Sequence, residues 1–384
     1  MSGSSRQPSP GRGRSRLAAF WGGFTAFVLA GIGLLQYLGP PPKPPPSASA
    51  HAAAASSAAS LPSGVKKPPS PPLKATPAAR MGTSGALAAG APIPPAMPAL
   101  LTPSATNPGW LVPRIGPDGL PPMRAYAAGA SGAGRGPSVA VLVAGLGDDA
   151  LQSQQAVASL PPAISLALTP YGQHAAAITA LAHAAGHETL LAIPMQETDP
   201  ASENAGNEAL VPAGPVTLNQ AMLDWCLSRV QGYAGVTDAM GATQGAGFMA
   251  NPDAKAWLLQ EIADKGLFFV DAEPTGQAAY AWNRTADVVI DPLNAPEKEN
   301  AQLAELALDA KLQGAALGIL LTPAPQPVQA LAAWTRTLPA QGITLVPVSA
   351  IVAPPAGAPA GAPAMPPPAS AGPSSGQTSL PAHP

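Results

Sequence analysis

The sequence has little cysteine, little charge and few aromatic residues. Its single cysteine, Cys226, excludes an internal disulfide and a CxxC metal site. Only 10% of the residues are charged and the net charge is −2, so electrostatics give no support for nucleic-acid binding. The sequence has no P-loop, HExxH or GxSxG motif. The best-marked signatures of nucleotide hydrolysis, zinc proteolysis and serine esterase chemistry are therefore absent.

Proline is abundant, and many of the 51 prolines crowd residues 39–137 and 353–384. Both stretches are rich in Ala, Pro, Ser and Gly, and such segments bury too little apolar surface to offset the entropy of ordering. We therefore expect a disordered linker at residues 39–137 and a disordered tail at residues 353–384. Residues 138–352 remain for one folded domain, which is long enough for a sizeable core.

The N-terminal sequence predicts a membrane anchor. Four arginines within residues 1–16 precede an uncharged apolar run at residues 17–38. A helix of that length spans about 33 Å, which is enough to cross the hydrocarbon core of a bilayer. The positive-inside rule keeps residues 1–16 cytoplasmic and places the rest of the chain beyond the membrane. We expect a single-pass inner-membrane protein with its folded domain in the periplasm; a cleavable signal peptide is the alternative.

From residue 138 onward, short apolar runs alternate with helical stretches. The expected strands are Val139–Ala144, Ile164–Leu168, Thr189–Ile193, Val236 with its neighbours, Leu267–Val270, Val288–Ile290, Leu317–Leu321 and Thr344–Val346. The expected helices are Asp149–Ser159, His174–Ala185, Leu218–Gln231, Asp253–Lys265, Pro296–Gln313 and Pro327–Leu338. Apolar strands separated by helices predict an α/β fold with a parallel sheet covered on both faces. About seven such strands fit an irregular (β/α) barrel or a doubly wound sheet.

In both of these folds, functional residues lie at the carboxyl ends of the strands. Asp238, Asp271 and Asp291 each follow an expected strand, so we expect the three carboxylates to point toward one rim. The alternative is that each aspartate caps the helix or turn that follows it. The candidate catalytic residues are Asp238 and Asp271, and the candidate binding residues are Gln196, Thr237, Asp291 and Thr322.

The turn Gly145-Leu146-Gly147 after the first expected strand has the spacing of a dinucleotide-binding turn. Such a site also needs an acidic residue at the end of the next strand, and the stretch ISLALTPYG has none. Asp148 and Asp149 would also place negative charge where a pyrophosphate should bind. We therefore interpret the turn as tight backbone before an Asp-capped helix.

Two histidines are spaced four apart, His183 and His187, which suits a shared metal on a helix. Gly186 is expected to end that helix between them, so we interpret both as part of a solvated helix face. No histidine follows an expected strand, although histidine is the commonest zinc ligand and general base. We expect no bound metal and no cofactor.

The order of motifs resembles the divergent polysaccharide deacetylase family, a branch of the carbohydrate esterase barrels. The segments that carry the resemblance are VAVLVAGLG, LPPAISLALTPYG, AAGHETLLAIPMQ, GYAGVTDAMGA, KGLFFVDAE and QGITLVPVSAI. They run from about residue 139 to residue 352. The resemblance implies an irregular (β/α) barrel, an envelope location and a role in carbohydrate metabolism.

The polar positions of the family pattern are mostly replaced. The resemblance implies two aspartates at the end of the first strand, where this sequence has Ala144 and Gly145. It implies histidines at Ala192 and Ala239, an acid at Gln196, a Ser-Arg pair at Ala272 and Glu273, and a histidine at Thr322. Deacetylation of this class needs a metal that activates water, and a divalent site wants three or four protein ligands. Asp238 and Asp271 alone are too few.

Three hypotheses follow. The first is a membrane-anchored pseudoenzyme that binds an envelope glycan or a protein partner in the old cleft. Candidate sugar-stacking residues for it are Tyr171, Trp225, Trp257 and Trp282. The second is an active metal-dependent hydrolase that uses Asp238, Asp271 and Asp291. The third is a non-catalytic scaffold whose cleft is closed by Met195, Met240 and Met249.

Overall fold

The computed structural model describes residues 87–130, 136–201, 204–272 and 281–355. All of them belong to one compact unit, residues 79–384. The predicted basic N-terminus and membrane anchor lie outside the described residues, as does nearly all of the predicted tail. Within the described ranges, no helix combines the length and apolar character needed to cross a membrane.

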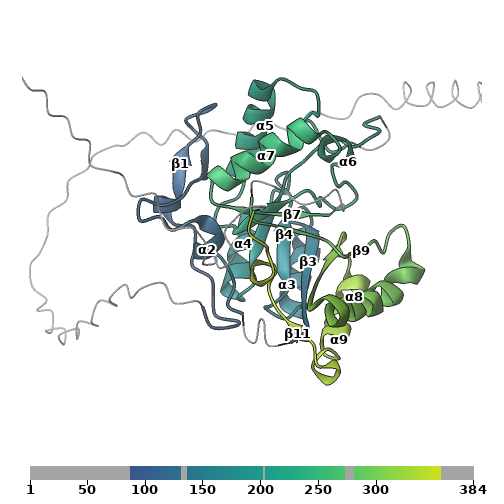
Figure 1. Ribbon diagram of the computed structural model, residues 1–384. Helices are drawn as coiled ribbons and strands as arrows, with labels where there is room; N and C mark the ends of the chain where they lie inside the picture. Colours follow the sequence, from purple (N-terminus) through teal and green to yellow (C-terminus); the bar gives the residue numbers. More distant parts are fainter. Residues whose placement is uncertain (1–86, 131–135, 202–203, 273–280, 356–384) are drawn as a thin grey trace, which may run out of the picture. The chain divides into compact units, whose positions relative to one another are not determined.

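A curled parallel sheet is the centre of the fold (Figure 1). Eight of its strands follow one another side by side in the order β8-β7-β6-β5-β4-β3-β10-β9, and β11 also pairs with β3. The bounds are β3 Ser138–Leu146, β4 Ser165–Leu168, β5 Thr189–Ala192, β6 Gly235–Thr237, β7 Phe268–Asp271, β8 Asn283–Thr285, β9 Val288–Ile290, β10 Ala315–Leu320 and β11 Thr344–Leu345. This half-barrel confirms the predicted fold class, and only β8 among these strands was not expected from the sequence.

The two edge strands of the sheet are consecutive in the chain. β8 pairs with β7, while β9 pairs with β10, and only Ala286 and Asp287 separate β8 from β9. The backbone N–H of Ala286 donates to Asp271, and that of Asp287 donates to Leu317. One short extended stretch therefore joins the two edges, which is why the sheet curls into a barrel-like form rather than staying open.

Helices cover the outer face of the sheet, close to where the sequence predicts them. Their bounds are α3 Ala150–Ser159, α4 Ala175–Ala184, α5 Val216–Ser228, α6 Ala246–Met249, α7 Pro252–Asp264, α8 Glu299–Gln313 and α9 Pro325–Thr335. The Asp149 side chain caps α3 by accepting from the Gln152 N–H, and Asn251 caps α7 just before Pro252. Gly186 and Gly266 follow α4 and α7 with φ of 85° and 72°, in the left-handed conformation expected of a helix-ending glycine.

Side chains on the two faces of the sheet form two separate cores. Val139, Val141 and Val143 of β3 pack outward against the helices. Ala140, Leu142 and Ala144 of the same strand point inward and pack with the inner residues of the other strands. This alternation is the period of two that a strand imposes. The inner core fills the curled sheet from one end to the other.

The prediction of a disordered linker at residues 39–137 is wrong for residues 87–130. They form the hairpin β1 (Leu101–Pro103) and β2 (Leu111–Pro113) and the short helix α2 (Pro122–Ala125). Spaced apolar residues order this proline-rich segment, because Ile93, Leu100 and Tyr126 bury their side chains in the inner core. The tail also begins later than expected, since Ala353 pairs with Asn283.

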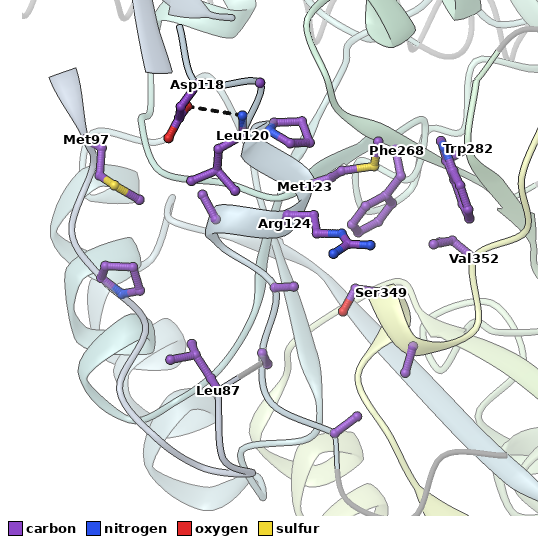
Figure 2. Close-up of a pocket in the computed structure, with 18 residues that line it drawn as sticks. Leu87, Met97, Asp118, Leu120, Met123, Arg124, Phe268, Trp282, Ser349 and Val352 are labelled. Carbon is purple, nitrogen blue, oxygen red and sulfur yellow. Dashed lines mark hydrogen bonds between the residues drawn. The ribbon is translucent and has the colours of Figure 1, made fainter. Parts of the chain in front are cut away.

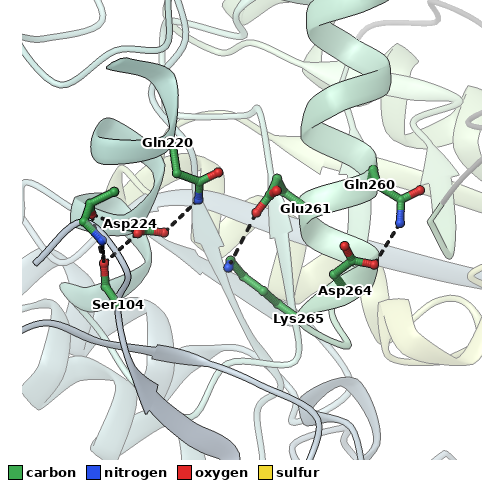
Figure 3. Close-up of polar contacts among 8 residues, drawn as sticks. Ser104, Gln220, Asp224, Gln260, Glu261, Asp264 and Lys265 are labelled. Atoms are coloured by element: carbon green, nitrogen blue, oxygen red, sulfur yellow. Dashed lines mark hydrogen bonds and ion pairs between the residues drawn. The ribbon is translucent and has the colours of Figure 1, made fainter. Parts of the chain in front are cut away.

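The hairpin is fastened to the outer helices by one buried carboxylate (Figure 3). Asp224 of α5 accepts hydrogen bonds from the Ser104 hydroxyl at 2.6 Å and the Thr106 hydroxyl at 2.9 Å. Gln220, one helical turn earlier, donates to its other oxygen at 3.0 Å. The carboxylate is therefore satisfied without a cation, and it fixes the hairpin against α5.

A second buried carboxylate joins three segments at the amino ends of the strands. Glu188, directly before β5, accepts from the Ala128 N–H at 3.2 Å, the Ser165 hydroxyl at 3.1 Å and the Ser349 N–H at 3.1 Å. Burial raises the pKa of this carboxyl. Glu188 thus links the segment before the barrel, β4 and the short helical turn η4 (Val348–Ala350) that ends the domain.

The interpretation of His183 and His187 as part of a solvated helix face is wrong, because both rings are buried. His183 bonds to the Thr189 hydroxyl at 3.0 Å and stacks on Tyr126, with ring centroids 6.2 Å apart. The His187 ring lies 2.8 Å from the carbonyl oxygen of Ile164. Both histidines hold structure together, and among the three histidines in the described ranges only His174 is exposed.

We predict that protonation of His183 destabilises the fold. Burial lowers its pKa from 6.5 to about 4. The stabilisation is therefore complete above the unfolded pKa and is lost as the pH falls toward the folded one. Denaturant unfolding should show the advantage of wild type over His183→Gln shrinking by about 2 kcal/mol between about pH 7.5 and pH 5. Exposed His174→Gln is the control, and a pH-independent gap between wild type and His183→Gln would contradict the prediction.

Candidate functional site

The carboxyl ends of the strands, where the sequence predicts a site, are lined by small apolar residues. Ala144, Ala192 and Ala239 are completely buried. Ala144 and Ala239 belong to the inner core, together with Ala272 after β7 and Leu321 after β10. The inner core therefore continues up to the mouth of the barrel.

Backbone also crosses this mouth. A Cβ added at Gly145, at the end of β3, would lie 3.3 Å from Pro323 and 3.9 Å from the Cα of Gly241. Gly241 follows β6, and β6 is separated from β3 by β4 and β5. The loop after β6 must therefore reach across the mouth to the ends of β3 and β10. Gly145 has φ of 80° and no space for a side chain, so the position requires glycine.

The polar groups of the Gly145-Leu146-Gly147 turn bond within the protein. The Gly147 N–H donates to the Ser153 hydroxyl at 2.9 Å, and its carbonyl accepts from the His174 N–H at 3.0 Å. A Cβ on Gly147 would lie 2.9 Å from Ala175 at the start of α4. The turn therefore serves close packing of β3, α3 and α4, and its geometry agrees with the structural interpretation of the sequence.

Asp238 and Asp271 come together behind the strands. Val236 and Phe269 pack in the outer core, so strand alternation places Asp238 and Asp271 on that outer side as well. Lys255 of α7 forms an ion pair with Asp271 at 3.0 Å. Both carboxyls are buried, and neither lies with the apolar residues that fill the barrel mouth.

The surroundings of Asp238 favour the neutral form of its carboxyl group. One oxygen accepts from the Ala272 N–H at 2.7 Å. The other is buried without a hydrogen-bond partner in the described part of the chain. Burial raises the pKa of Asp238 well above its usual range, and the negative charge of Asp271 raises it further. These surroundings favour the protonated form of Asp238, beside an Asp271 that forms an ion pair with Lys255.

Asp291 does not join this pair. Its carboxylate accepts from the Leu293 and Asn294 N–H groups, both at 3.2 Å, and from the Asn294 side chain at 2.6 Å. This is the turn-capping role that the sequence left as the alternative. Within the described part of the chain, Asp291 does not join Asp238 and Asp271 in a group of side chains able to hold a metal ion.

The remaining candidate binding residues lie near the mouth and make structural contacts. The Thr237 hydroxyl is buried and accepts from the Ala239 N–H at 3.1 Å. Gln196 is half-buried, and its backbone bonds to Leu210 and Phe248. Thr322 is half-buried after β10.

Sequence reasoning missed Glu197, which is the best-bound carboxylate near the mouth. It accepts from three successive backbone N–H groups, those of Gln244 at 2.5 Å, Gly245 at 2.6 Å and Ala246 at 3.0 Å. A Cβ at Gly247 would lie 2.4 Å from the Glu197 carbonyl oxygen, so the loop needs glycine to pack so closely. The feature of the sequence that could have indicated this contact is the glycine-rich stretch QGAGF. Its backbone N–H groups form an anion-binding turn, and the carboxylate of Glu197 is the anion bound there.

The candidate aromatic residues fall into different places. Tyr171, after β4, is 36% exposed and packs on Trp225 of α5 with ring centroids 5.3 Å apart. The guanidinium of Arg229 lies over Trp225, 5.4 Å from the ring centroid. Trp257 is half-buried against the outer core. Trp282 directly precedes β8 in the chain and therefore lies at the amino ends of the strands, opposite the mouth.

The donor set does not fit the metal that the family resemblance implies. The described residues contain no group of three or more His, Cys, Asp or Glu side chains able to hold a metal ion. In the pair Asp238 and Asp271, one carboxyl has a raised pKa and the other is ion-paired with Lys255. The scaffold hypothesis expects Met195, Met240 and Met249 to close the cleft, but Met195 and Met249 are buried in the outer core and Met240 is half-buried.

Comparison with known proteins supports the resemblance. A family model described as divergent polysaccharide deacetylase matches residues 141–352. The crystal structure of an uncharacterized protein from Agrobacterium tumefaciens C58 matches with a TM-score of 0.58 and 30% sequence identity, over 63% of this chain and 100% of that chain. The match therefore extends over the whole of that crystallised chain. No curated protein matches the sequence.

We predict that Asp238 is protonated at neutral pH. Infrared difference spectroscopy of wild type against Asp238→Asn should show the loss of one protonated-carboxyl band. The substitution should change the free energy of unfolding by less than about 1 kcal/mol, because a neutral carboxyl is replaced by a neutral amide of similar shape. Asp264→Asn, at an exposed position of α7, is the control. A carboxylate band lost in its place would contradict the prediction.

Proposed function

The chain belongs to the divergent polysaccharide deacetylase family, and from this premise we propose that it is a non-catalytic member that binds an envelope glycan or a protein partner. Its family gives it a carbohydrate-related, deacetylase-like role. The proposal concerns how that role is carried out: recognition is retained and hydrolysis is lost.

One observation carries the proposal, namely the apolar packing of the barrel mouth. Hydrolysis of an acetyl group needs an activated water molecule and a group that accepts its proton. Ala144, Ala192 and Ala239 occupy positions where the family resemblance implies polar groups, and all three are completely buried. The loop that carries Gly241 crosses the mouth over Gly145. The buried alanines supply neither a metal ligand nor a group that could accept a proton from water.

The best surface for a sugar lies beside the mouth. Aromatic rings stack on the apolar faces of sugar rings, and a neighbouring cation adds hydrogen bonds to hydroxyl or carboxylate groups. Tyr171 offers an exposed ring, Trp225 supports it from α5, and Arg229 brings the charge. We assign glycan contact to this group, which we call the Tyr171 shelf.

The proposal includes a location. Residues 17–38 would anchor the chain in the inner membrane, and the domain would lie in the periplasm. With residues 87–130 folded onto the barrel, the proline-rich tether shortens to residues 39–86. The sequence pattern supports this arrangement through the arginines on one side of the apolar run.

The scaffold alternative is favoured by the same closed mouth, because an apolar core that continues up to the mouth is what a non-catalytic scaffold would have. It differs from the proposal in one respect, since a pure scaffold would bind no glycan. The hydrolase alternative would need Asp238, Asp271 and Asp291 to act together, and the described geometry separates the third from the first two.

The test uses residues 87–355, which contain both cores. Acetylated and deacetylated chitooligosaccharides and peptidoglycan fragments are titrated by calorimetry, and acetate release is measured after zinc loading. We expect saturable binding of at least one glycan, no retained zinc, and no acetate release that depends on Asp238 or Asp271. Tyr171→Ala should weaken binding by about tenfold, in keeping with the loss of one stacking contact.

The control is Trp257→Phe, because Trp257 packs against the outer core and is not part of the Tyr171 shelf. Zinc-dependent acetate release that is lost in Asp238→Ala would overturn the proposal in favour of the hydrolase. Absence of glycan binding, with the fold intact by circular dichroism, would support the scaffold alternative instead.

A further inference from the structure

A cavity of about 740 Å³ lies at the end of the barrel opposite the mouth (Figure 2). Helix α2 and the loop before it form one wall. The start of β7, the residue before β8 and the turn η4 form the other. Backbone bonds from Met123 to Gly266 and from Phe269 to Trp282 hold these walls at the amino ends of the strands. The volume is in the range of pockets that bind small molecules.

The side chains that line the cavity are mostly apolar. Met97, Leu120, Met123, Phe268, Trp282 and Val352 supply the large ones, and several alanines fill the spaces between them. The charged or hydroxyl-bearing side chains are Asp118, Arg124 and Ser349. Asp118 turns back on its own loop and accepts from the Leu120 N–H at 3.2 Å.

The lining favours an apolar ligand over a saccharide. Each sugar hydroxyl taken out of water needs a hydrogen-bond partner, and an unpaired one costs on the order of 1 to 3 kcal/mol. Among the described lining side chains, Asp118, Arg124 and Ser349 are the charged or hydroxyl-bearing ones, which is few for a ring of hydroxyls. An apolar ligand body gains the hydrophobic contribution of the apolar wall that it covers.

The positive charge of Arg124 favours a ligand with an anionic head group. Figure 2 shows the Arg124 guanidinium reaching into the space between Phe268 and Ser349. The guanidinium has five N–H donors, so it can bind an anionic group bidentately while keeping another contact. Asp118, the one acid in the lining, is drawn at the far side of the cavity from Arg124.

We propose that this cavity binds a small single-chain amphiphile with one anionic head group. The head would lie between Arg124 and Ser349, and the apolar body would pack between Phe268, Trp282 and Met123. The site is separate from the barrel mouth and from the Tyr171 shelf, and it does not depend on the function proposed for them.

The test measures displacement of anilinonaphthalene sulfonate, an apolar anionic dye, from residues 87–355. The competitors are laurate, lauryl phosphate and lauryl maltoside, each below its critical micelle concentration. We expect laurate and lauryl phosphate to displace the dye saturably, and the neutral maltoside to bind at least about tenfold more weakly because it lacks the charge-assisted hydrogen bond. The two anionic competitors distinguish a carboxylate from a phosphate head group.

Arg124→Gln should weaken laurate binding about tenfold and leave maltoside binding unchanged. Arg124 is exposed, so the variant should fold. Arg114→Gln is the matched control, because Arg114 is an exposed arginine of the same segment that does not line the cavity. Ala350→Phe places a ring in the cavity and should weaken binding of the dye and of every competitor.

Three outcomes would overturn the proposal. The first is absence of laurate binding to the folded protein. The second is laurate binding that Arg124→Gln and Arg114→Gln affect equally, or that Ala350→Phe leaves unchanged. The third is displacement of the dye by a chitooligosaccharide more tightly than by laurate, which would make the cavity a glycan site.

Discussion

The structure depends above all on how the inside of the curled sheet is filled. A parallel sheet that curls into a half-barrel must bury the side chains on its inner face, and here they are almost all apolar, from Ala140 to Ala144 of β3 and from Leu317 to Leu321 at the end of β10. At the amino ends of the strands, the segment 87–130 folds over the sheet and completes this core, with Glu188 as the shared hydrogen-bond acceptor. At the carboxyl ends, small residues and the loop through Gly241 complete it. Polar chemistry is thereby displaced to the margins: the Asp238–Asp271 pair lies behind the strands, and the cavity beside Arg124 lies at the other end.

Much of the fold could be predicted from the sequence because the barrel strands are continuous apolar runs and the helices carry clear boundary residues. β3 and α7 are examples, with Gly145 ending the first and Asn251-Pro252 beginning the second. The folded segment 87–130 could not be found in this way. Its strands are three residues long and its anchoring residues are spaced among prolines, so its order comes from contacts distant in sequence, such as Ser104 with Asp224. Composition measures average burial and does not register a few well-placed apolar side chains.

The candidate site was predictable in part. The position of Asp238 and Asp271 at neighbouring strand ends follows from the strand assignment, and their proximity agrees with it. The face of the sheet on which the two carboxyls lie could not be predicted from the strand assignment. A shift of one residue in the strand alternation exchanges the inner and outer faces. Asp291 illustrates the same limit, since a strand-end aspartate can equally cap its own turn. Glu197 was missed because its partners are backbone N–H groups of a distant glycine-rich loop, which leave no pattern of charged residues in the sequence.

The central claim is that the barrel mouth is a closed apolar core, and Ala144→Asp tests it most directly. The measurement is the free energy of unfolding of this variant at neutral pH, with and without saturating zinc, beside Ala176→Asp at an exposed position of α4. We predict that Ala144→Asp lowers the free energy of unfolding by more than about 4 kcal/mol or prevents folding, because an unpaired carboxylate would be buried in apolar surroundings. Saturating zinc should not restore the lost stability. Near wild-type stability that rises with zinc concentration would contradict the account, since it would show that the mouth is an open polar site able to bind a metal.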